Sequence, residues 1–143
     1  MIAVAVVVGL SSLSVLSFYR RDLTGDYVGE SSQGTLFGSG ENARGHARTV
    51  TRERVVVTRE SDGSLHLRYG TCDLPAREGR DRLVATLTKA SCIVDGRGPL
   101  ALSGTFRTGW EHRSLEVVVT GRDDGSGDEA DYSYFFSGQR VDR

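Results

Sequence analysis

The feature that most constrains this chain is the alternation of apolar and polar residues that recurs after residue 22. Leu65, Leu67 and Tyr69, for example, alternate with His66 and Arg68. Such a period of two is typical of a strand with one buried face, whereas an amphipathic helix repeats its apolar residues every three to four positions. The same pattern occurs at Leu83, Ala85 and Leu87, at Leu115, Val117 and Val119, and at Tyr132, Tyr134 and Phe136. We therefore expect an all-β protein.

Turn-forming residues divide the chain into short segments. We expect strands over residues 23–29, 49–60, 64–71, 83–88, 92–94, 100–106, 115–119 and 132–136, with a polar connection over 38–48, a hairpin turn at 62–63, a loop from Pro75 to 82 and a turn over 96–99. No crossover helix is visible, so we do not expect a parallel sheet. A chain of 143 residues fits one domain. These features favour a single antiparallel up-and-down β-barrel of about seven or eight strands over a small sandwich.

The first 19 residues have a different character, because they contain no charged side chain. The run from Ile2 to Phe18 predicts an apolar N-terminal helix, which is either a signal peptide or a membrane anchor. On this interpretation residues 1–19 are the leader and residues 20–143 are the barrel domain. Arg20 and Arg21 follow directly, and by the positive-inside rule they would keep the domain in the cytoplasm. A buried strand is a further alternative for the leader.

The two cysteines, Cys72 and Cys92, favour export. Neither belongs to a CxxC pair, so zinc-site spacing is absent. Two cysteines in a small domain behind an apolar leader predict one disulfide formed in an oxidising compartment. We therefore expect a protein of the cell envelope, periplasmic or extracellular, that is either cleaved or held at the membrane by its leader. Two buried thiols in a cytoplasmic protein are the alternative.

The charge balance excludes a strongly basic nucleic-acid binder, because 18 Lys and Arg oppose 19 Asp and Glu. Residues 44–59 hold five arginines, which are either a solvated face or an anion-binding patch. No aromatic residues are interleaved with them, so we expect no nucleic-acid partner. The acidic stretch over 123–131 is either a solvated hairpin loop or a weak Ca²⁺ site.

Catalytic and cofactor motifs are absent from the sequence. His46, His66 and His112 are not spaced as metal ligands, and no G-x-S-x-G elbow is present. An enzyme would need an acid–base pair such as His112 with Glu111 or Asp128. We therefore expect a protein that is not an enzyme and has no cofactor or bound metal.

The aromatic residues are the best candidates for a functional site, because they fall on alternating strand positions. In a small barrel, inward-pointing aromatic side chains either fill the interior or line a ligand cavity. The candidates for contacting a ligand are Tyr27, Tyr69, Phe106, Tyr132 and Tyr134. The expected function is non-catalytic binding of a small apolar or amphipathic molecule in the barrel.

Both ends of the domain also resemble a known family. The opening Leu23-Thr-Gly25-Asp-Tyr27 is similar to the first strand of calycin-type barrels, the lipocalins and avidins, which have Gly-x-Trp there. The resemblance implies that Arg140, near the end of the last strand, lies against Tyr27. The tryptophans that hold biotin in avidins have no counterparts, so biotin is not implied. In outline the pattern is also similar to the small periplasmic inhibitors of bacterial metalloproteases, which are barrels with one disulfide.

A second hypothesis is a protein-binding or structural module of the cell envelope, including a protease-inhibitor-like barrel. Val118 and Phe135 interrupt the polar phase of their strands, so something is expected to cover the outer face there. The arginine strand is the other candidate surface. A filled barrel would argue against the small-ligand hypothesis, and an open, lined barrel would argue against the structural one.

Overall fold

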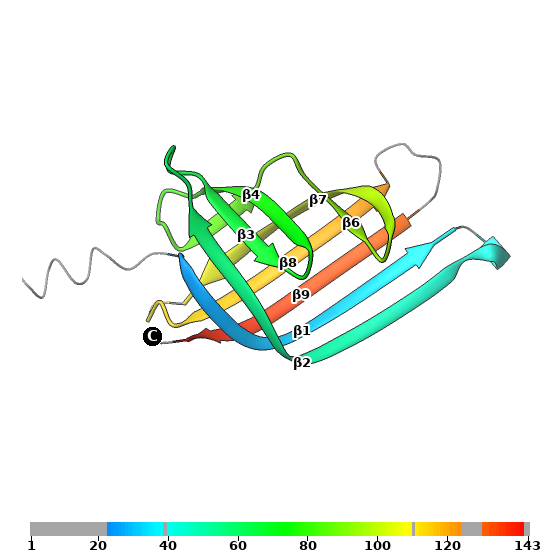
Figure 1. Ribbon diagram of the computed structural model, residues 1–143, viewed down its shortest axis with the longest axis horizontal. Coiled ribbons are helices and arrows are strands. Elements are labelled where there is room, and N and C mark those ends of the chain that lie inside the picture. The colour runs from blue at the N-terminus through cyan, green and yellow to red at the C-terminus, as the bar shows by residue number, and fades with distance from the viewer. Residues whose placement is uncertain (1–22, 39, 110, 124–129, 142–143) are drawn as a thin grey trace, which may run out of the picture.

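The computed structural model describes residues 23–38, 40–109, 111–123 and 130–141 (Figure 1). The predicted leader, Trp110 and most of the predicted acidic loop lie outside these ranges. The strands are β1 (Gly25–Phe37), β2 (Arg44–Arg59), β3 (Leu65–Tyr69), β4 (Cys72–Glu78), β5 (Val84–Leu87), β6 (Ala90–Val94), β7 (Arg97–Thr108), β8 (Ser114–Asp123) and β9 (Ala130–Arg140), with a 3₁₀ turn η1 (Gly40–Asn42). Among the described residues, no helix has the length and apolar character needed to cross a membrane.

The strands form one antiparallel sheet that closes on itself. Its order is β5-β4-β3-β2-β1-β9-β8-β7-β6, and β5 also pairs with β7. Because β5 and β6 both pair with the same edge of β7, the nine described strands occupy eight positions around the barrel. The predicted all-β, antiparallel barrel is therefore confirmed. Closure joins the first strand to the last, since β1 pairs with β9 from Tyr27–Arg140 to Phe37–Ala130.

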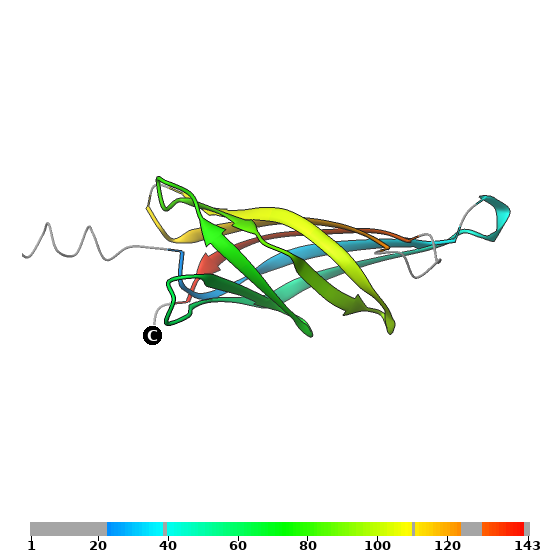
Figure 2. The same ribbon diagram turned by 90° about the horizontal axis from the view of Figure 1, so that it is seen from above.

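The barrel is longer on one side than on the other (Figure 2). Strand β3 pairs only with Val56–Arg59 of β2. The segments 31–37 of β1 and 44–50 of β2 continue beyond it as a long hairpin, which we call the hairpin extension. One end of the barrel, near Tyr27, is therefore ringed by eight strands, and we call it the closed end. At the other, open end the inner face of the sheet is only partly covered.

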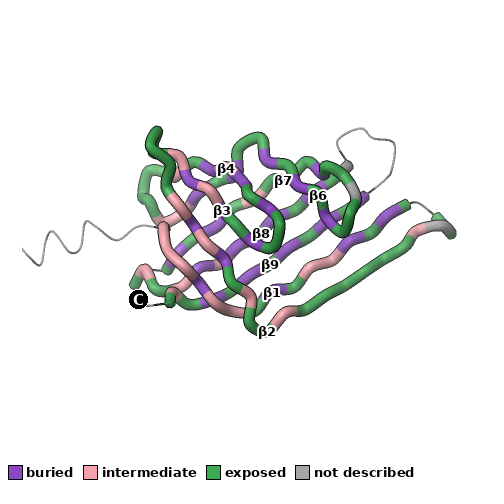
Figure 3. Tube along the Cα trace, viewed as in Figure 1, coloured by how far each residue is buried: buried purple, intermediate pink, exposed green. Residues whose placement is uncertain are grey.

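The core occupies the barrel interior, where alternate residues of each strand are buried (Figure 3). Hydrophobic burial dominates the stability of such a domain. Tyr27, Phe106 and Phe136 are among the largest side chains that are fully buried, together with leucines from four of the strands. The closed half of the barrel is thus a packed core.

The cysteine prediction is also confirmed, because Cys72 and Cys92 form a disulfide. It joins the first residue of β4 to the middle of β6. These two strands do not pair with each other through backbone hydrogen bonds. The disulfide therefore holds β6 over the open end, where sheet pairing alone would leave it attached only to β7.

Three expectations about the strand boundaries are wrong. Strand β1 continues past residue 29 to Phe37, and residues 44–48 belong to β2 and not to a connection. The apolar alternation that marks a strand is missing there, because the buried positions Ser31 and Thr35 are polar and residues 44–49 are exposed. Pro75 lies within β4. A proline is accommodated at that position because the β4–β5 ladder begins only at the next residue, Ala76.

The turn between β6 and β7 is shorter than expected. Only Asp95 and Gly96 form it, and β7 already begins at Arg97. Both turn residues have positive φ, which suits the tight two-residue connections of hairpins. The predicted hairpin turn at Asp62 and Gly63 is confirmed, with Gly63 at a φ of 88°.

Candidate functional site

The closed end is sealed by Arg140, whose side chain lies against Tyr27. Arg140 Nη2 donates to the Tyr27 hydroxyl at 2.9 Å, and the guanidinium carbon lies 5.3 Å from the centre of the Tyr27 ring. Nη1 donates to the carbonyl of Thr24 at 2.9 Å and Nε to that of His112 at 3.0 Å. The contact that the resemblance implied is therefore confirmed.

Glycine at position 25 permits this arrangement. A Cβ atom there would lie 3.2 Å from Arg140 Nη1, and the φ of 150° is one that other residues rarely adopt. The Tyr27 hydroxyl in turn donates to the carbonyl of Leu23 at 2.8 Å. Tyr27 thus closes the base of the barrel with its hydroxyl bonded within the protein. It does not line the pocket at the open end.

The Phe106 side chain also packs in the core and does not line the pocket. It is fully buried in the closed half and pairs across the sheet with Ala85 and Val117. Two of the five predicted ligand-binding residues, Tyr27 and Phe106, therefore lie below the open end. The other three, Tyr69, Tyr132 and Tyr134, lie together.

These three tyrosines form a layer across the barrel. Tyr69, the last residue of β3, stacks on Tyr134 of β9 with ring centres 3.9 Å apart and planes within 9° of parallel. The hydroxyls of Tyr69 and Tyr132 are hydrogen-bonded at 3.1 Å. All three side chains are at least 96% buried. The layer separates the packed core from the open end.

A pocket of about 430 Å³ lies on this layer. Tyr69 and Tyr132 form its floor, and the β3–β4 and β6–β7 turns form part of its wall. Gln33, Arg48 and Glu53 supply its polar side chains from β1 and β2. The Tyr132 hydroxyl lies 3.5 Å from Gln33 Oε1 and donates to it. The volume lies within the range of small-molecule sites, and the lining combines two tyrosines with several polar side chains.

The surroundings of the pocket change the pKa values of its tyrosines. Burial, together with the negative charge of Glu53, raises the pKa of Tyr134. Burial also raises the pKa of Tyr132 to about 12, against the opposing effect of its hydrogen bond with Tyr69. The three phenols are therefore neutral hydrogen-bonding groups at physiological pH.

Two polar atoms beside the pocket have no hydrogen-bond partner in the structure. They are the hydroxyl of Tyr134 and Oε2 of Glu53, and the two side chains are close enough for Glu53 to raise the pKa of Tyr134. Buried polar atoms are almost always paired, and exceptions commonly mark a place where a water molecule or a ligand binds. Of these two residues, only Glu53 lines the pocket.

Gln33, Arg48 and Glu53 were missed as pocket residues by the sequence reasoning. Gln33 carried no distinguishing pattern. Arg48 was noted only as part of the arginine strand. Glu53 did carry a signal, because it is in phase with Val55 and Val57 on β2, and all three point inward. A carboxylate at an inward-facing strand position is unusual, and this signal indicates a functional residue.

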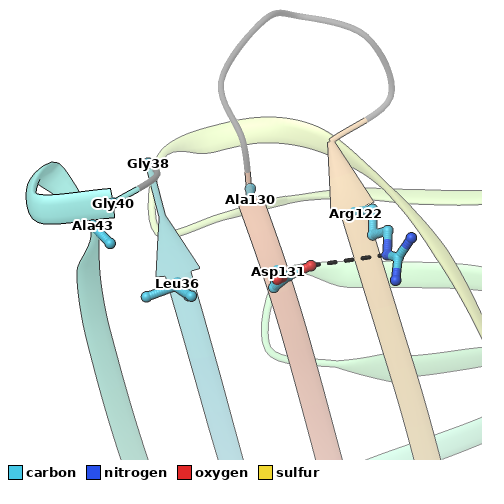
Figure 4. A pocket seen from close by; sticks show the side chains of 7 residues that line it. All are labelled: Leu36, Gly38, Gly40, Ala43, Arg122, Ala130 and Asp131. Atoms are coloured by element: carbon cyan, nitrogen blue, oxygen red, sulfur yellow. Dashed lines mark ion pairs between the residues drawn. The ribbon is translucent and has the colours of Figure 1, made fainter.

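Another pocket, of about 520 Å³, lies at the far end of the hairpin extension (Figure 4). It is lined by Leu36, Gly38, Gly40, Ala43, Arg122, Ala130 and Asp131. Arg122 and Asp131 form an ion pair at 3.9 Å, and both side chains are more than 70% exposed. An exposed pair of this kind contributes little to binding or stability. The pocket has no aromatic side chain, so it is the weaker candidate.

The outer face carries the two apolar residues singled out in the sequence. Val118 and Phe135 are partners in the β8–β9 ladder and are 47% and 46% exposed. They form a small apolar spot among serine and threonine residues. That a protein partner covers this spot stays a prediction.

Metal ligands and histidines add no further site. Among the described residues, no group of three or more His, Cys, Asp or Glu is placed to hold a metal ion. His66 lies on the outer face of β3, 2.7 Å from Asp73. Comparison of the chain with protein-family models, with curated proteins and with solved structures gives no match. The class of protein is therefore defined by the fold alone: a small disulfide-bonded antiparallel β-barrel with a pocket at its open end.

Proposed function

We propose that this protein is a non-catalytic binding protein that holds a small amphipathic molecule in the pocket at the open end of the barrel. The observation that carries the proposal is the combination of an aromatic floor, Tyr69 and Tyr132, with polar side chains on one wall. The packed core below the tyrosine layer restricts the ligand to this pocket. It is therefore a compact molecule and not a long alkyl chain threaded into the barrel.

Binding would combine two contributions. An apolar ring or short chain would lie on the tyrosine floor, and each 100 Å² of apolar surface removed from water contributes about 2.5 kcal/mol. The polar part of the ligand would meet Gln33, Arg48 and Glu53. Because the positive charge of Arg48 shares the pocket with the carboxylates of Glu53 and Asp95, a ligand with both a hydrogen-bond donor and an acceptor group fits best.

The wider assignment rests on the barrel and its closed end. The Gly25-x-Tyr27 opening and the Arg140 contact support a calycin-like relationship, with Tyr27 in the place of the family's tryptophan. The disulfide supports an oxidising compartment such as the periplasm or the cell exterior. Within the described part of the chain, neither histidine nor serine lines the pocket. This favours binding over catalysis.

The test uses 8-anilinonaphthalene-1-sulfonate, an aromatic anion, as a first probe and follows its fluorescence and the backbone-amide NMR shifts it causes. We expect saturable binding with shifts around Tyr69, Tyr132 and Gly96. Arg48→Gln should weaken binding about tenfold, as expected for loss of one charged hydrogen bond of about 1.4 kcal/mol. Tyr27→Phe, at the closed end, is the matched control and should bind as the wild type does.

Two results would overturn the proposal. One is binding that is equal in the wild type and in Arg48→Gln, with shifts spread over the outer face. The other is the absence of binding by the probe and by matched aromatic amines and aromatic zwitterions at millimolar concentration. Thermal unfolding of each variant, measured in parallel, separates a loss of affinity from a loss of folded protein.

A further inference from the structure

Among the residues that the structure describes, no strand pairs with the outer edge of β2 along the hairpin extension. Residues 44–55 of β2 pair with β1 on one side, whereas β3 pairs only with Val56–Arg59 on the other. The burial along β2 agrees with this, because residues 44–49 are all exposed and only Val50 of this segment is half-buried. Figure 3 shows the hairpin-extension part of β2 as an exposed stretch at the rim of the sheet.

An open edge of this length presents a row of unpaired backbone N–H and C=O groups. The regular part runs from Arg44 to Val50, since the register with β1 shifts between Val50 and Glu53. Seven residues span about 23 Å, which is as long as an ordinary strand. Edges of this kind are templates for pairing with another strand unless charge or a cover prevents it.

The side chains along this edge are basic on one face and small on the other. Arg44, His46 and Arg48 are cross-strand partners of alternate β1 residues and share the inner face. Gly45, Ala47 and Thr49 alternate with them. The small face offers no steric obstacle to an added strand, so the basic face determines which strand is accepted.

The arginines here differ from those farther along β2. Arg54 and Arg59 are engaged by Asp26 and Glu78 respectively. In the described part of the chain, Arg44 and Arg48 form no ion pair. A second copy of the protein would bring the same positive charges to the edge, and like charges placed opposite each other destabilise strand pairing.

We propose that the segment Arg44–Val50 of β2 accepts an extended acidic segment of another protein as an added strand. The backbone of the incoming strand would pair with the open edge, and its carboxylates would face Arg44 and Arg48. This is strand addition, in which main-chain hydrogen bonds provide affinity and alternate side chains provide specificity. The proposal shares Arg48 with the pocket, so its test changes Arg44, which does not line the pocket.

The test uses a capped seven-residue peptide in which glutamate alternates with threonine and valine. Three comparison peptides accompany it: one with lysine in place of glutamate, and two with N-methyl groups on the odd-numbered or on the even-numbered amides. An added strand directs only one set of amides toward β2. We therefore expect the acidic peptide to bind, the lysine peptide not to bind, and only one of the two N-methylated peptides to lose its affinity.

The site is located by amide hydrogen exchange and by charge reversal. We expect alternate amides between Arg44 and Val50 to become protected when the acidic peptide is added. Arg44→Glu should weaken binding at least about fivefold, a change of about 1 kcal/mol. Arg113→Glu, an exposed arginine at the closed end with the same change of charge, is the control and should leave binding unchanged.

Three outcomes would overturn the proposal. If both N-methylated peptides bind as well as the parent peptide, the attraction is a charge effect without strand pairing. If the protein dimerises without peptide and protects residues 44–50, a second copy occupies the edge. If single-stranded DNA binds the same residues more tightly than the peptide does, the patch recognises nucleic acid.

Discussion

Arg140 provides the sharpest test of how the barrel is held closed. Its guanidinium donates hydrogen bonds to the carbonyls of Thr24 and His112 and to the hydroxyl of Tyr27, at 2.9–3.0 Å. These acceptors belong to the entry to β1, to β1 itself and to the β7–β8 connection. One side chain therefore ties the first and last strands to the loop between β7 and β8.

The magnitude follows from these contacts. Hydrogen bonds to charged groups contribute about 1.5–3 kcal/mol each, and because these are only partly buried we take about 1 kcal/mol apiece. The cation–π contact with Tyr27 adds about 0.5–1 kcal/mol. Arg140→Met should therefore cost about 3–4 kcal/mol. Arg140→Lys should cost about 2 kcal/mol, because a single ammonium cannot reach all three acceptors at once.

The assay is urea unfolding followed by far-UV circular dichroism, with the disulfide kept intact. With a denaturant slope of about 2 kcal/mol per molar, Arg140→Lys should lower the midpoint by about 1 M. Arg113→Lys, at an exposed arginine near the same end, is the control and should leave the midpoint unchanged. A double-mutant cycle with Tyr27→Phe should show a coupling of about 1 kcal/mol between the two side chains.

One result would refute this reasoning. If Arg140→Lys is within about 0.5 kcal/mol of the wild type, the planar fork of hydrogen bonds does not stabilise the closed end. An absence of coupling in the cycle would show that the contact with Tyr27 carries no energy of its own.

Three further predictions follow from the barrel. Cys92→Ser should lower the free energy of unfolding by about 3 kcal/mol in the chain-entropy account, and a reducing agent should then have no further effect on the unfolding midpoint. Gly29→Ala should destabilise the protein by about 3 kcal/mol, because the new Cβ would lie 2.1 Å from the carbonyl oxygen of Ser137. Gly45→Ala is the control and should be tolerated in the same unfolding assay, because its nearest contact is at 3.7 Å. Burial raises the pKa of Tyr132 to about 12 from an ordinary 10.0. The neutral phenol therefore contributes fully to the free energy of unfolding below pH 10, and this contribution is lost as the pH rises toward 12. Phenolate absorbance should accordingly rise together with alkaline unfolding.

The fold was predictable from sequence wherever one face of a strand is buried. Leu65, Leu67 and Tyr69 alternate because β3 has core on one side and solvent on the other, and their strand was placed within a residue or two. The hairpin extension was missed because its buried positions Ser31 and Thr35 are polar and residues 44–49 are all exposed, so the sequence shows no apolar alternation there. Those segments are strands because of their register with each other and with β9, which is a long-range property.

The candidate site was predictable only in part, for a related reason. Tyr69 and Tyr132 were identified because aromatic residues in the phase of the core are visible in the sequence. Their proximity across the barrel was not visible, and neither was the role of Tyr27, whose hydroxyl and ring are used at the opposite end. Arg48 joins the site only because the register of β2 with β1 shifts between Glu53 and Val50, so that an even-numbered residue of β2 opposes the inward-facing Gln33.

The pairing of β1 with β9 has a consequence for the order in which the protein folds. Strands β3 and β4 are neighbours along the chain and need only a short turn to pair, so they can form while the chain is still being synthesised. Strand β1 cannot complete its ladder until β9 has left the ribosome, which is nearly the whole chain later. Until then, the edges of β1 and β8 that pair with β9 are unpaired. In a translation product that ends before Ala130, these edges would stay unpaired. We expect such a product to aggregate and be degraded instead of accumulating as a smaller barrel.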